Sequence, residues 1–371
     1  MTVEIARLRL ANQQIAVPKH TAARDVVAAF GAMQAQEYGS SLWAVGLRMA
    51  NAVKGDIEQA LASAAIVRTW TLRGTLHLVA AQDVRWMLDL VAPRAIARSA
   101  HRLRQLDIDD VVIKTSRGLL DEALSDGGRL TRNEAFVLLE RAGIQTTGQR
   151  GIHILRRLSL DGLLVQAAFA VGQATFGLLD ALIPERSALS REEALAQLAW
   201  RYFSSHGPAT VKDFAWWSAI TAADATTGIQ MVSDRLESAK IGDAVYWMPV
   251  MPSPLQSPLP AVRVLPGFDE YILGYVDRRH ALGDVASARI VRNGMFLPAI
   301  VVDACAVGIW RPGNGRSASR VAEMFSSLDP ATSHAVDAAL GRYDAFVTDR
   351  QHRPNNGIEQ TARAVREGPE E

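Results

Sequence analysis

The chain has 371 residues, of which 49% are hydrophobic and 21% are charged, and its net charge is +1. This composition is typical of a folded globular protein, and the length predicts more than one compact unit. The near-neutral charge excludes binding to nucleic acid through overall charge, so any phosphate contact must come from local basic patches. The single cysteine, Cys305, excludes an intrachain disulfide and fits a reducing cytoplasm.

The chain carries no pattern typical of export or membrane insertion. Its first residues lack the basic start and apolar core of a signal peptide. The most apolar stretch, 163–183, is interrupted by glycines and polar residues, so we expect a β-hairpin there. We therefore expect a cytoplasmic monomer without a membrane partner.

Residues 1–125 are predicted to form a winged-helix unit, which is a set of helices followed by a two-stranded hairpin, with further helices after it. A hairpin is expected over 66–79, with Arg73 and Gly74 at its turn or bulge. The helical patterns cover 3–13, 21–33, 41–49, 56–64, 81–90, 94–106 and 109–124.

The same order of helices and hairpin recurs in 126–185 and in 186–250. Thr131 and Glu134 have the spacing of a capping box, and so do Ser190 and Glu193. Thr210 is expected to cap a third helix. The remaining patterns are helices over 148–160, 211–218 and 222–236 and hairpins over 163–180 and around 240–243.

The C-terminal third has a different pattern. A proline-rich segment is expected to end in a linker over 251–260, and short strands follow in 261–347, which is typical of a small barrel or sandwich. The expected strands cover 261–265, 271–276, 288–291, 298–302 and 306–310, before a helix over 330–347 and a tail over 348–371. The predicted fold class is therefore α+β, with three tandem winged-helix units followed by a small C-terminal β-barrel.

Gln34 and Gln36 flank Ala35 between two helical stretches. On a regular helix these side chains would point about 200° apart. They can converge only if the backbone leaves the helix, which the turn-like residues 37–39 favour. Two converging amides can hold one water molecule, although neither can act as a strong base. The alternative is two polar residues at a helix exit.

The strongest basic face lies on the predicted helix 148–160. Arg150, His153 and Arg157 fall at i, i+3 and i+7, and Arg156 lies beside them. This face is typical of a recognition helix that binds DNA. The alternative is a solvated surface on which Arg157 pairs with Asp161 one turn later. A second basic run, around Arg94 and Arg98, favours a surface face over phosphate contact.

The sequence predicts no cofactor and no metal site. The eight histidines form no His-x-x-x-His pair, and the single cysteine excludes a Cys-x-x-Cys pair. There is also no phosphate-cradling glycine loop and no Gly-x-Ser-x-Gly elbow. Metal-dependent, nucleotide-dependent and serine-hydrolase chemistries are therefore not indicated.

Four segments in order resemble the AlkZ-like winged-helix DNA glycosylases, the AlkZ/YcaQ superfamily. They are 32–38 with 41–48, 73–79, 265–271 with 274–278, and 307–311. The resemblance runs from about residue 10 to about residue 345. It implies three winged helices and a β-barrel curved around a cleft of the size of DNA.

The resemblance also implies roles for particular residues. It makes Gln34 and Gln36 the catalytic pair. It makes Arg73 and His77 candidates for contact with DNA near the lesion, against the alternative that both are structural. Arg278 and Arg311, in matched segments, are further DNA-binding candidates.

Asp269 and Glu270 are paired carboxylates in one matched segment. On a strand, adjacent side chains point to opposite faces, so only one could enter a cleft. We expect buried pairing with arginines that holds the barrel to the winged helices. The alternative is that one carboxylate stabilises positive charge on the sugar.

The leading hypothesis is a monofunctional glycosylase that removes cationic alkylated purines from double-stranded DNA. N7-alkylguanine and N3-alkyladenine are already good leaving groups, so a positioned water suffices. Bulky adducts and interstrand crosslinks are further candidate substrates, in base excision repair or in self-resistance. The rival hypotheses are a non-catalytic winged-helix regulator of transcription and a degenerate member that serves as an interaction protein.

Overall fold

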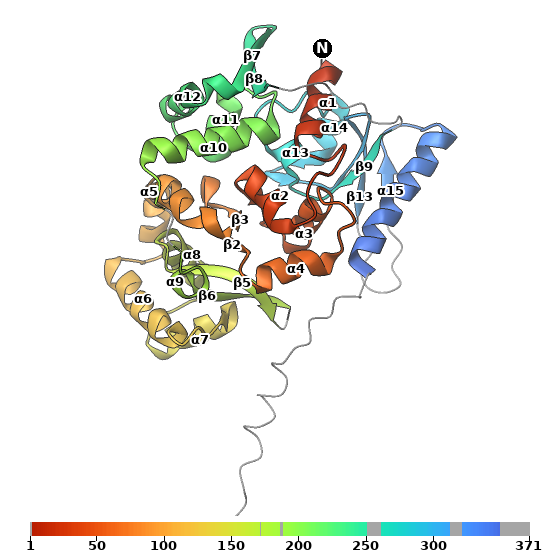
Figure 1. The fold of residues 1–371 in the computed structure, drawn as a ribbon. Coiled ribbons are helices and arrows are strands. Elements are labelled where there is room, and N and C mark those ends of the chain that lie inside the picture. Colours follow the sequence, from red (N-terminus) through yellow and green to blue (C-terminus); the bar gives the residue numbers. More distant parts are fainter. Residues whose placement is uncertain (1, 171, 186–187, 251–260, 312–320, 349–371) are drawn as a thin grey trace, which may run out of the picture.

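The computed structural model describes residues 2–170, 172–185, 188–250, 261–311 and 321–348. Helices and small sheets form a mixed fold in which the C-terminal strands and last helix pack against the N-terminal helices (Figure 1). The predicted linker 251–260 and the tail after 348 lie outside these residues. Within the described ranges, no helix has both the length and the apolar character needed to cross a bilayer.

The first part of the chain follows the predicted order of helices and hairpin. Helix α2 ends at Phe30 because Gly31 takes a φ of 79°, which glycine adopts without steric cost. The chain then leaves the helix before Gln34. The elements are α1 (Thr2–Asn12), α2 (Ala23–Phe30), β1 (Met33–Gln34), α3 (Tyr38–Gly46), α4 (Lys54–Ala62), β2 (Ile66–Trp70), the 3-10 turn η1 (Leu72–Gly74) and β3 (Leu76–Ala80).

One long helix replaces the two helices expected over 81–90 and 94–106. After the 3-10 turn η2 (Ala81–Asp83), α5 runs from Val84 to Gln105 with Pro93 inside it. Proline lacks a backbone donor, but tertiary packing outweighs this loss, because buried apolar residues on both sides of Pro93 join the core. Asp109 then caps α6 (Asp110–Leu124) by accepting from the Val112 N–H at 2.8 Å.

The capping boxes predicted for the middle of the chain are confirmed. Thr131 and Glu134 exchange hydrogen bonds at the start of α7, and Ser190 and Glu193 do so at the start of α10. Thr210 caps α11. The elements are β4 (Leu130–Thr131), α7 (Arg132–Arg141), α8 (Arg150–Leu160), β5 (Leu164–Ala170), β6 (Gln173–Leu178), α9 (Leu179–Leu182), α10 (Arg191–His206), α11 (Val211–Ser218), α12 (Ala222–Met231), η3 (Ser233–Arg235), β7 (Leu236–Ile241) and β8 (Ala244–Pro249).

The first two hairpins share one sheet. Its six strands have the order β1-β3-β2-β5-β6-β4, and β2 meets β5 where Arg68 lies opposite Gln166. The third hairpin, β7 with β8, forms a separate sheet. The strand β1, which carries Gln34, is therefore at the edge of a sheet built from two parts of the chain.

The C-terminal strands form an open sheet, and no closed barrel is found among the described residues. Its order is β14-β13-β12-β9, and β10 and β11 pair separately. The strands expected over 271–276 and 288–291 were wrong, because 270–273 and 284–290 are helical. The elements are β9 (Val262–Leu265), α13 (Glu270–Leu273), α14 (Asp284–Ile290), β10 (Val291–Arg292), β11 (Met295–Phe296), β12 (Ala299–Val302), β13 (Cys305–Arg311), β14 (Val321–Met324) and α15 (Pro330–Thr348).

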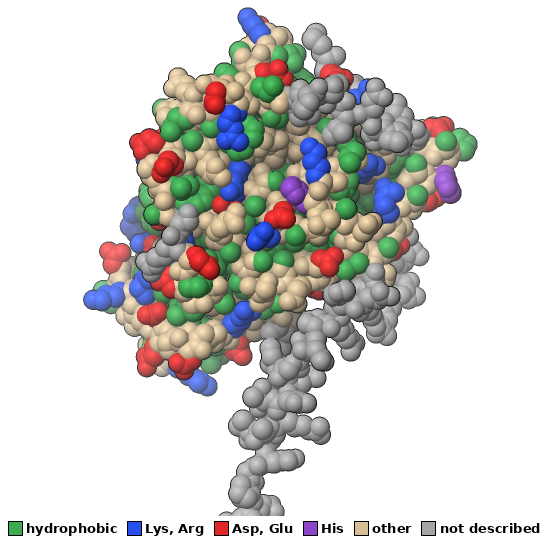
Figure 2. Space-filling view, viewed as in Figure 1, with side chains coloured by type: hydrophobic (Ala, Val, Ile, Leu, Met, Phe, Trp, Pro, Cys, Tyr) green, Lys and Arg blue, Asp and Glu red, His purple; other side chains and the backbone are tan. Residues whose placement is uncertain are grey.

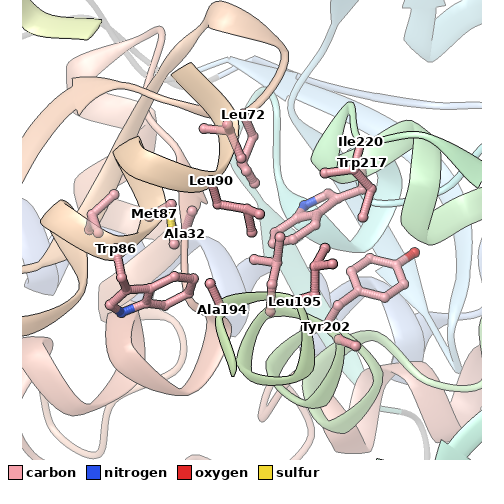
Figure 3. Close-up of a cluster of buried hydrophobic side chains, with 14 of the residues drawn as sticks. Ala32, Leu72, Trp86, Met87, Leu90, Ala194, Leu195, Tyr202, Trp217 and Ile220 are labelled. Atoms are coloured by element: carbon pink, nitrogen blue, oxygen red, sulfur yellow. The ribbon is translucent and has the colours of Figure 1, made fainter. Parts of the chain in front are cut away.

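A buried cluster joins the first part of the chain to α10 and α11. Figure 3 shows Leu72, Leu90 and Met87 on one side and Leu195 and Trp217 on the other, in one continuous apolar core. Burial of such side chains supplies most of the favourable free energy of folding. This core fixes α11 beside the turn η1, next to the strand that carries Gln34.

Candidate active site

The backbone has left the helix at Gln34 and Gln36, as the pattern around Ala35 favoured. Gln34 lies on β1, where it pairs with His77 of β3, and the Ala35 N–H donates to the Leu76 carbonyl at 2.8 Å. Gln36 follows at a bend before α3. On a strand adjacent side chains point to opposite sides, and Met33 is buried in the core between α2 and α3, so Gln34 faces away from that core.

The two glutamines differ in exposure. Gln34 is 8% exposed, whereas Gln36 is exposed. The Thr75 hydroxyl donates to the Gln34 Oε1 atom at 3.2 Å. The Gln34 Nε2 amide has no hydrogen-bond partner within the part of the chain that the structure describes. This amide is therefore a donor available to a bound water molecule or to DNA.

Arg68 fixes the backbone around the glutamines. Its Nε atom donates to the Ala35 carbonyl at 2.8 Å, and its Nη2 atom donates to the Gln36 carbonyl at 3.2 Å. Burial lowers the pKa of Arg68 to about 10, so it stays charged near neutral pH. The role of Arg68 was missed in the sequence, because nothing local connects it to residues 32 positions away.

Glu270 contacts the other side of the Gln34 backbone. Its Oε1 atom accepts from the Gln34 N–H at 2.7 Å, and its Oε2 atom accepts from the Trp217 indole at 2.9 Å. His206 Nε2 lies 3.3 Å from Oε2. Burial raises the pKa of Glu270, but the His206 hydrogen bond and the charge of Arg73 outweigh it and bring the pKa to about 2. The site thus contains a buried, ionised carboxylate.

Asp269 has a separate partner. Arg48 donates to both of its carboxylate oxygens, at 2.8 and 2.9 Å, and both side chains are fully buried. Asp269 also accepts from the Tyr271 N–H, because these residues begin the short helix α13. The expectation that a strand would turn the two carboxylates to opposite faces was therefore wrong: both point into the protein.

Arg73 and His77 contact each other under the surface. Arg73 Nη2 lies 3.4 Å from His77 Nε2, and Arg73 Nη1 donates to the Trp217 carbonyl. His77 is 0% exposed, and burial together with the charge of Arg73 lowers its pKa to about 3. His77 is therefore a neutral, internal histidine, while Arg73 is only partly buried.

The basic face of α8 is partly occupied by contacts within the protein. Arg157 Nε donates to both oxygens of Asp161 at 3.1 Å, which is the alternative considered for this residue. Arg150 donates to the Asp107 carbonyl at 3.0 Å. His153 is half-buried, and burial lowers its pKa. Arg156, on the same face of α8, has no acidic partner among the described residues.

A family model described as "DNA glycosylase AlkZ-like" matches residues 27–346. This match covers most of the chain, including both glutamines. The chain belongs to the AlkZ-like DNA glycosylase family. The resemblance seen in the sequence motifs is thus confirmed, as is the prediction of a DNA N-glycosylase.

Relatives of this AlkZ-like glycosylase include a protein of Streptomyces sahachiroi. A curated protein named "Interstrand DNA cross-link repair glycosylase" is 24% identical over 333 residues, which cover 81% of this chain and 85% of the relative. The solved structure of "Streptomyces sahachiroi DNA glycosylase AlkZ" superposes with a TM-score of 0.72 at 22% identity. That superposition covers 92% of this chain and 95% of the other, and it shows a shared fold.

The remaining DNA-binding candidates of this glycosylase lie on the C-terminal part. Arg278 donates to the Ile272 carbonyl at 3.1 Å and lies over the rings of Trp216 and Phe296. Arg311 is exposed at the end of β13. The sequence carries two Asn-Gly turn signals in this region, and the one at 314–315 lies outside the described residues. The one at Asn293 and Gly294 has φ angles of 50° and 77° and connects β10 to β11.

Basic and acidic side chains are interspersed over the face seen in Figure 2. This distribution agrees with the net charge of +1. No set of three or more His, Cys, Asp or Glu side chains that could hold a metal ion occurs within the described part of the chain.

Proposed function

We propose that this AlkZ-like glycosylase hydrolyses the N-glycosidic bond of cationic alkylated purines in double-stranded DNA. N7-alkylguanine and N3-alkyladenine define the substrate class. Bulky adducts and interstrand crosslinks belong to the same class when the alkylated purine is positively charged. The observation that carries the proposal is the Gln34-Ala35-Gln36 segment, in which the chain leaves the helix through the strand β1 and a bend. Its backbone contacts Glu270 and Arg68, which pre-organise the glutamines.

The proposed reaction needs little acid catalysis. A water oxygen held by the glutamine amides bonds to C1′ while the bond from C1′ to the base nitrogen breaks. The electron pair of that bond neutralises the positive charge of the base, and the attacking water loses its proton to solvent. Holding a reactant in place can lower a barrier by about 7 kcal/mol or more. Because glutamine is not a base, neutral bases such as uracil are predicted to be poor substrates.

Glu270 is the carboxylate suited to stabilise positive charge that develops on the sugar. Asp269 is unsuited because the Arg48 guanidinium, bound to both of its oxygens, neutralises it. The direct partners of Glu270 are the Gln34 N–H, the Trp217 indole and His206. Burial lowers the pKa of His206, so this histidine is neutral and the carboxylate keeps its charge. A fixed negative charge in a low-dielectric site can stabilise an oxocarbenium-like transition state.

The helices and hairpins fit this proposal as winged-helix units that place the strand β1 beside DNA. In this proposal the protein is a monomer that acts on the nucleoid in the cytoplasm. Its role is repair of alkylated DNA or self-resistance. A regulator would need α8 free to enter a major groove. Arg150 of that helix instead donates to the backbone carbonyl of Asp107, and Arg157 donates to the Asp161 carboxylate. These contacts favour the enzyme over the regulator.

The test is incubation of the protein with duplexes that differ in one base. A duplex with N7-methylguanine should release that base, whereas a matched duplex with uracil should release none. Release of uracil at a comparable rate would contradict the proposed dependence on a cationic leaving group. Tight binding to one undamaged sequence without any base release would instead identify a regulator.

A further inference from the structure

A basic pocket lies beside the proposed reaction site. It has a volume of about 220 Å³, and it is formed by the middle of α5, the turn η1, α8 and the segment between α11 and α12. Five arginines and one aspartate supply its charged groups: Arg73, Arg94, Arg98, Arg156, Arg191 and Asp224. The pocket therefore has a strong excess of positive charge in a protein whose net charge is only +1.

Two of these arginines are bound within the protein. Arg191 pairs with Asp224 at 2.9 Å, and Arg73 donates to the Trp217 carbonyl. Within the described part of the chain, no carboxylate lies within ion-pair distance of Arg94, Arg98 or Arg156. The exposed Arg94 and Arg98 and the half-buried Arg156 thus line one pocket, and its one carboxylate among the described residues, Asp224, is already paired with Arg191. Like charges held together are unfavourable unless an anion joins them.

Buried polar atoms at the pocket also lack hydrogen-bond partners. The Nε atom of Arg156 is one, and the hydroxyl of the fully buried Thr71 is another. Burial lowers the pKa of Arg156, because its charge is partly removed from water. A guanidinium fork and a hydroxyl are the donors that bind the oxygens of a phosphate. An acceptor with several oxygens and a negative charge would match these donors.

Gly74 allows Arg156 to reach this position. A Cβ atom at residue 74 would lie 2.2 Å from the Arg156 Nη2 atom, and the φ of 69° at Gly74 also favours glycine. The turn that carries Arg73 is thus open on the side where Arg156 enters. A side chain at residue 74 would push the guanidinium of Arg156 out of its place.

We propose that this pocket binds one phosphodiester group of the DNA strand that carries the damaged base. Arg73 connects the pocket to the reaction site, because it contacts Trp217, whose indole donates to Glu270, which in turn accepts from Gln34. A phosphate bound here would set the position of its own strand relative to the glutamines. This inference rests on DNA binding in the proposed function, but it does not require catalysis.

The first test measures how DNA affinity depends on salt. Each phosphate contact contributes about 0.9 to the slope of log K against log salt concentration. The double variant Arg98→Ala/Arg156→Ala should lower the magnitude of this slope by about 1 and weaken binding at least about 10-fold near 0.1 M salt. Arg98→Lys keeps the positive charge, so it should leave the slope of log K against log salt concentration unchanged. Arg141→Ala, at an exposed residue of α7 outside the pocket, removes one positive charge and is the control for each single variant, Arg98→Ala and Arg156→Ala. An unchanged slope in a folded double variant would overturn the proposal.

The second test replaces single phosphodiesters in the duplex by neutral methylphosphonates. In the wild type, one linkage near the damaged base should weaken binding when neutralised, and in the double variant the same linkage should have no effect. Equal effects in both proteins would overturn the proposal. A pocket that takes up inorganic phosphate while all linkages behave alike would be a free-anion site, which would also overturn it. Both readouts are binding on intact DNA, so failure of the glycosylase proposal would be seen separately.

Discussion

The backbone N–H of Gln34 donates to the buried carboxylate of Glu270, which lies 236 residues further along the chain, at 2.7 Å. This bond joins the N-terminal strand β1 to the short helix α13. The same carboxylate accepts from Trp217 of α11. One ionised side chain therefore connects three distant parts of the protein at the proposed site of reaction.

Removing this carboxylate should cost both stability and activity. Glu270→Ala leaves the Gln34 N–H and the Trp217 indole buried without an acceptor, which should lower the free energy of unfolding by about 3 kcal/mol. Glu270→Gln keeps an acceptor but removes the charge, so it should slow base release more than it affects stability. Urea unfolding and single-turnover release measure the two effects. If Glu270→Gln lost as much stability as Glu270→Ala, the effect of the charge on base release could not be separate from its effect on folding, which would contradict this prediction.

The hydrogen bonds from Arg68 to the Ala35 and Gln36 carbonyls, called here the Arg68 clamp, should affect the reaction although Arg68 does not contact a DNA base. Arg68→Met removes the hydrogen bonds to the Ala35 and Gln36 carbonyls and keeps much of the side-chain volume. A displacement of the glutamines by about 1 Å can slow a reaction about 100-fold. We expect a fall of that order in the single-turnover rate, with partial recovery in Arg68→Lys. A rate within twofold of wild type would show that the clamp does not position Gln36.

The ion pair of Arg48 and Asp269 is fully buried, so its two members should be strongly coupled. Arg48→Met leaves a buried carboxylate without a partner and should lower the free energy of unfolding by about 3 to 5 kcal/mol. The double variant Arg48→Met/Asp269→Asn should be more stable than Arg48→Met alone. A double-mutant cycle by urea unfolding tests this, and additive losses would exclude the coupling.

Buried neutral histidines should make stability depend on pH. The pKa of His77 falls from its ordinary 6.5 to about 3 in the folded protein, and that of His206 is also lowered. Below pH 6.5 the unfolded chain therefore binds more protons than the folded one, so stability is lost as the pH falls from 6.5 towards 3. Each such group contributes a slope of up to about 1.4 kcal/mol per pH unit.

His77→Gln tests this dependence, because glutamine does not titrate. The difference in unfolding free energy between wild type and His77→Gln should shrink as the pH is lowered from 7 to 4. Urea titrations at each pH give this difference. A constant difference over that range would contradict the lowered pKa, because it would mean that His77 has the same pKa in the folded and unfolded protein.

Local sequence patterns predicted the parts of the fold that depend on near neighbours. The capping pairs Thr131 with Glu134 and Ser190 with Glu193 lie three residues apart, and the structure confirms both. The exit from the helix before Gln36 was predicted from the turn-like residues 37–39, although the helix expected to run to residue 33 ends at Phe30.

Sequence patterns failed where contacts between residues distant in the chain determine the secondary structure. The apolar run after Asp269 was expected to be a strand, but Asp269 caps a helical turn. The Tyr271 hydroxyl, which donates to the Ala304 carbonyl, anchors that turn. Two helices were expected over 81–90 and 94–106, yet packing on both sides of Pro93 keeps α5 continuous. These outcomes depend on contacts that no window of sequence contains.

The candidate site shows the same division. Gln34 and Gln36 could be singled out because the residues around them resemble a known family, whereas their spacing alone left open two polar residues at a helix exit. Arg68 and His206 could not, since each reaches the site from far along the chain. A buried carboxylate held by three donors is visible only after the fold brings β1, α10 and α11 together.

The most direct measurement is the single-turnover rate of base release from a duplex with N7-methylguanine by glutamine variants. Gln34→Ala and Gln36→Ala should each lower the rate at least about 100-fold, because the water would lose its positioning. Gln230→Ala, on the exposed side of α12, is the matched control and should release the base at the wild-type rate. Release by the Gln34→Ala/Gln36→Ala double variant at the wild-type rate would contradict the account.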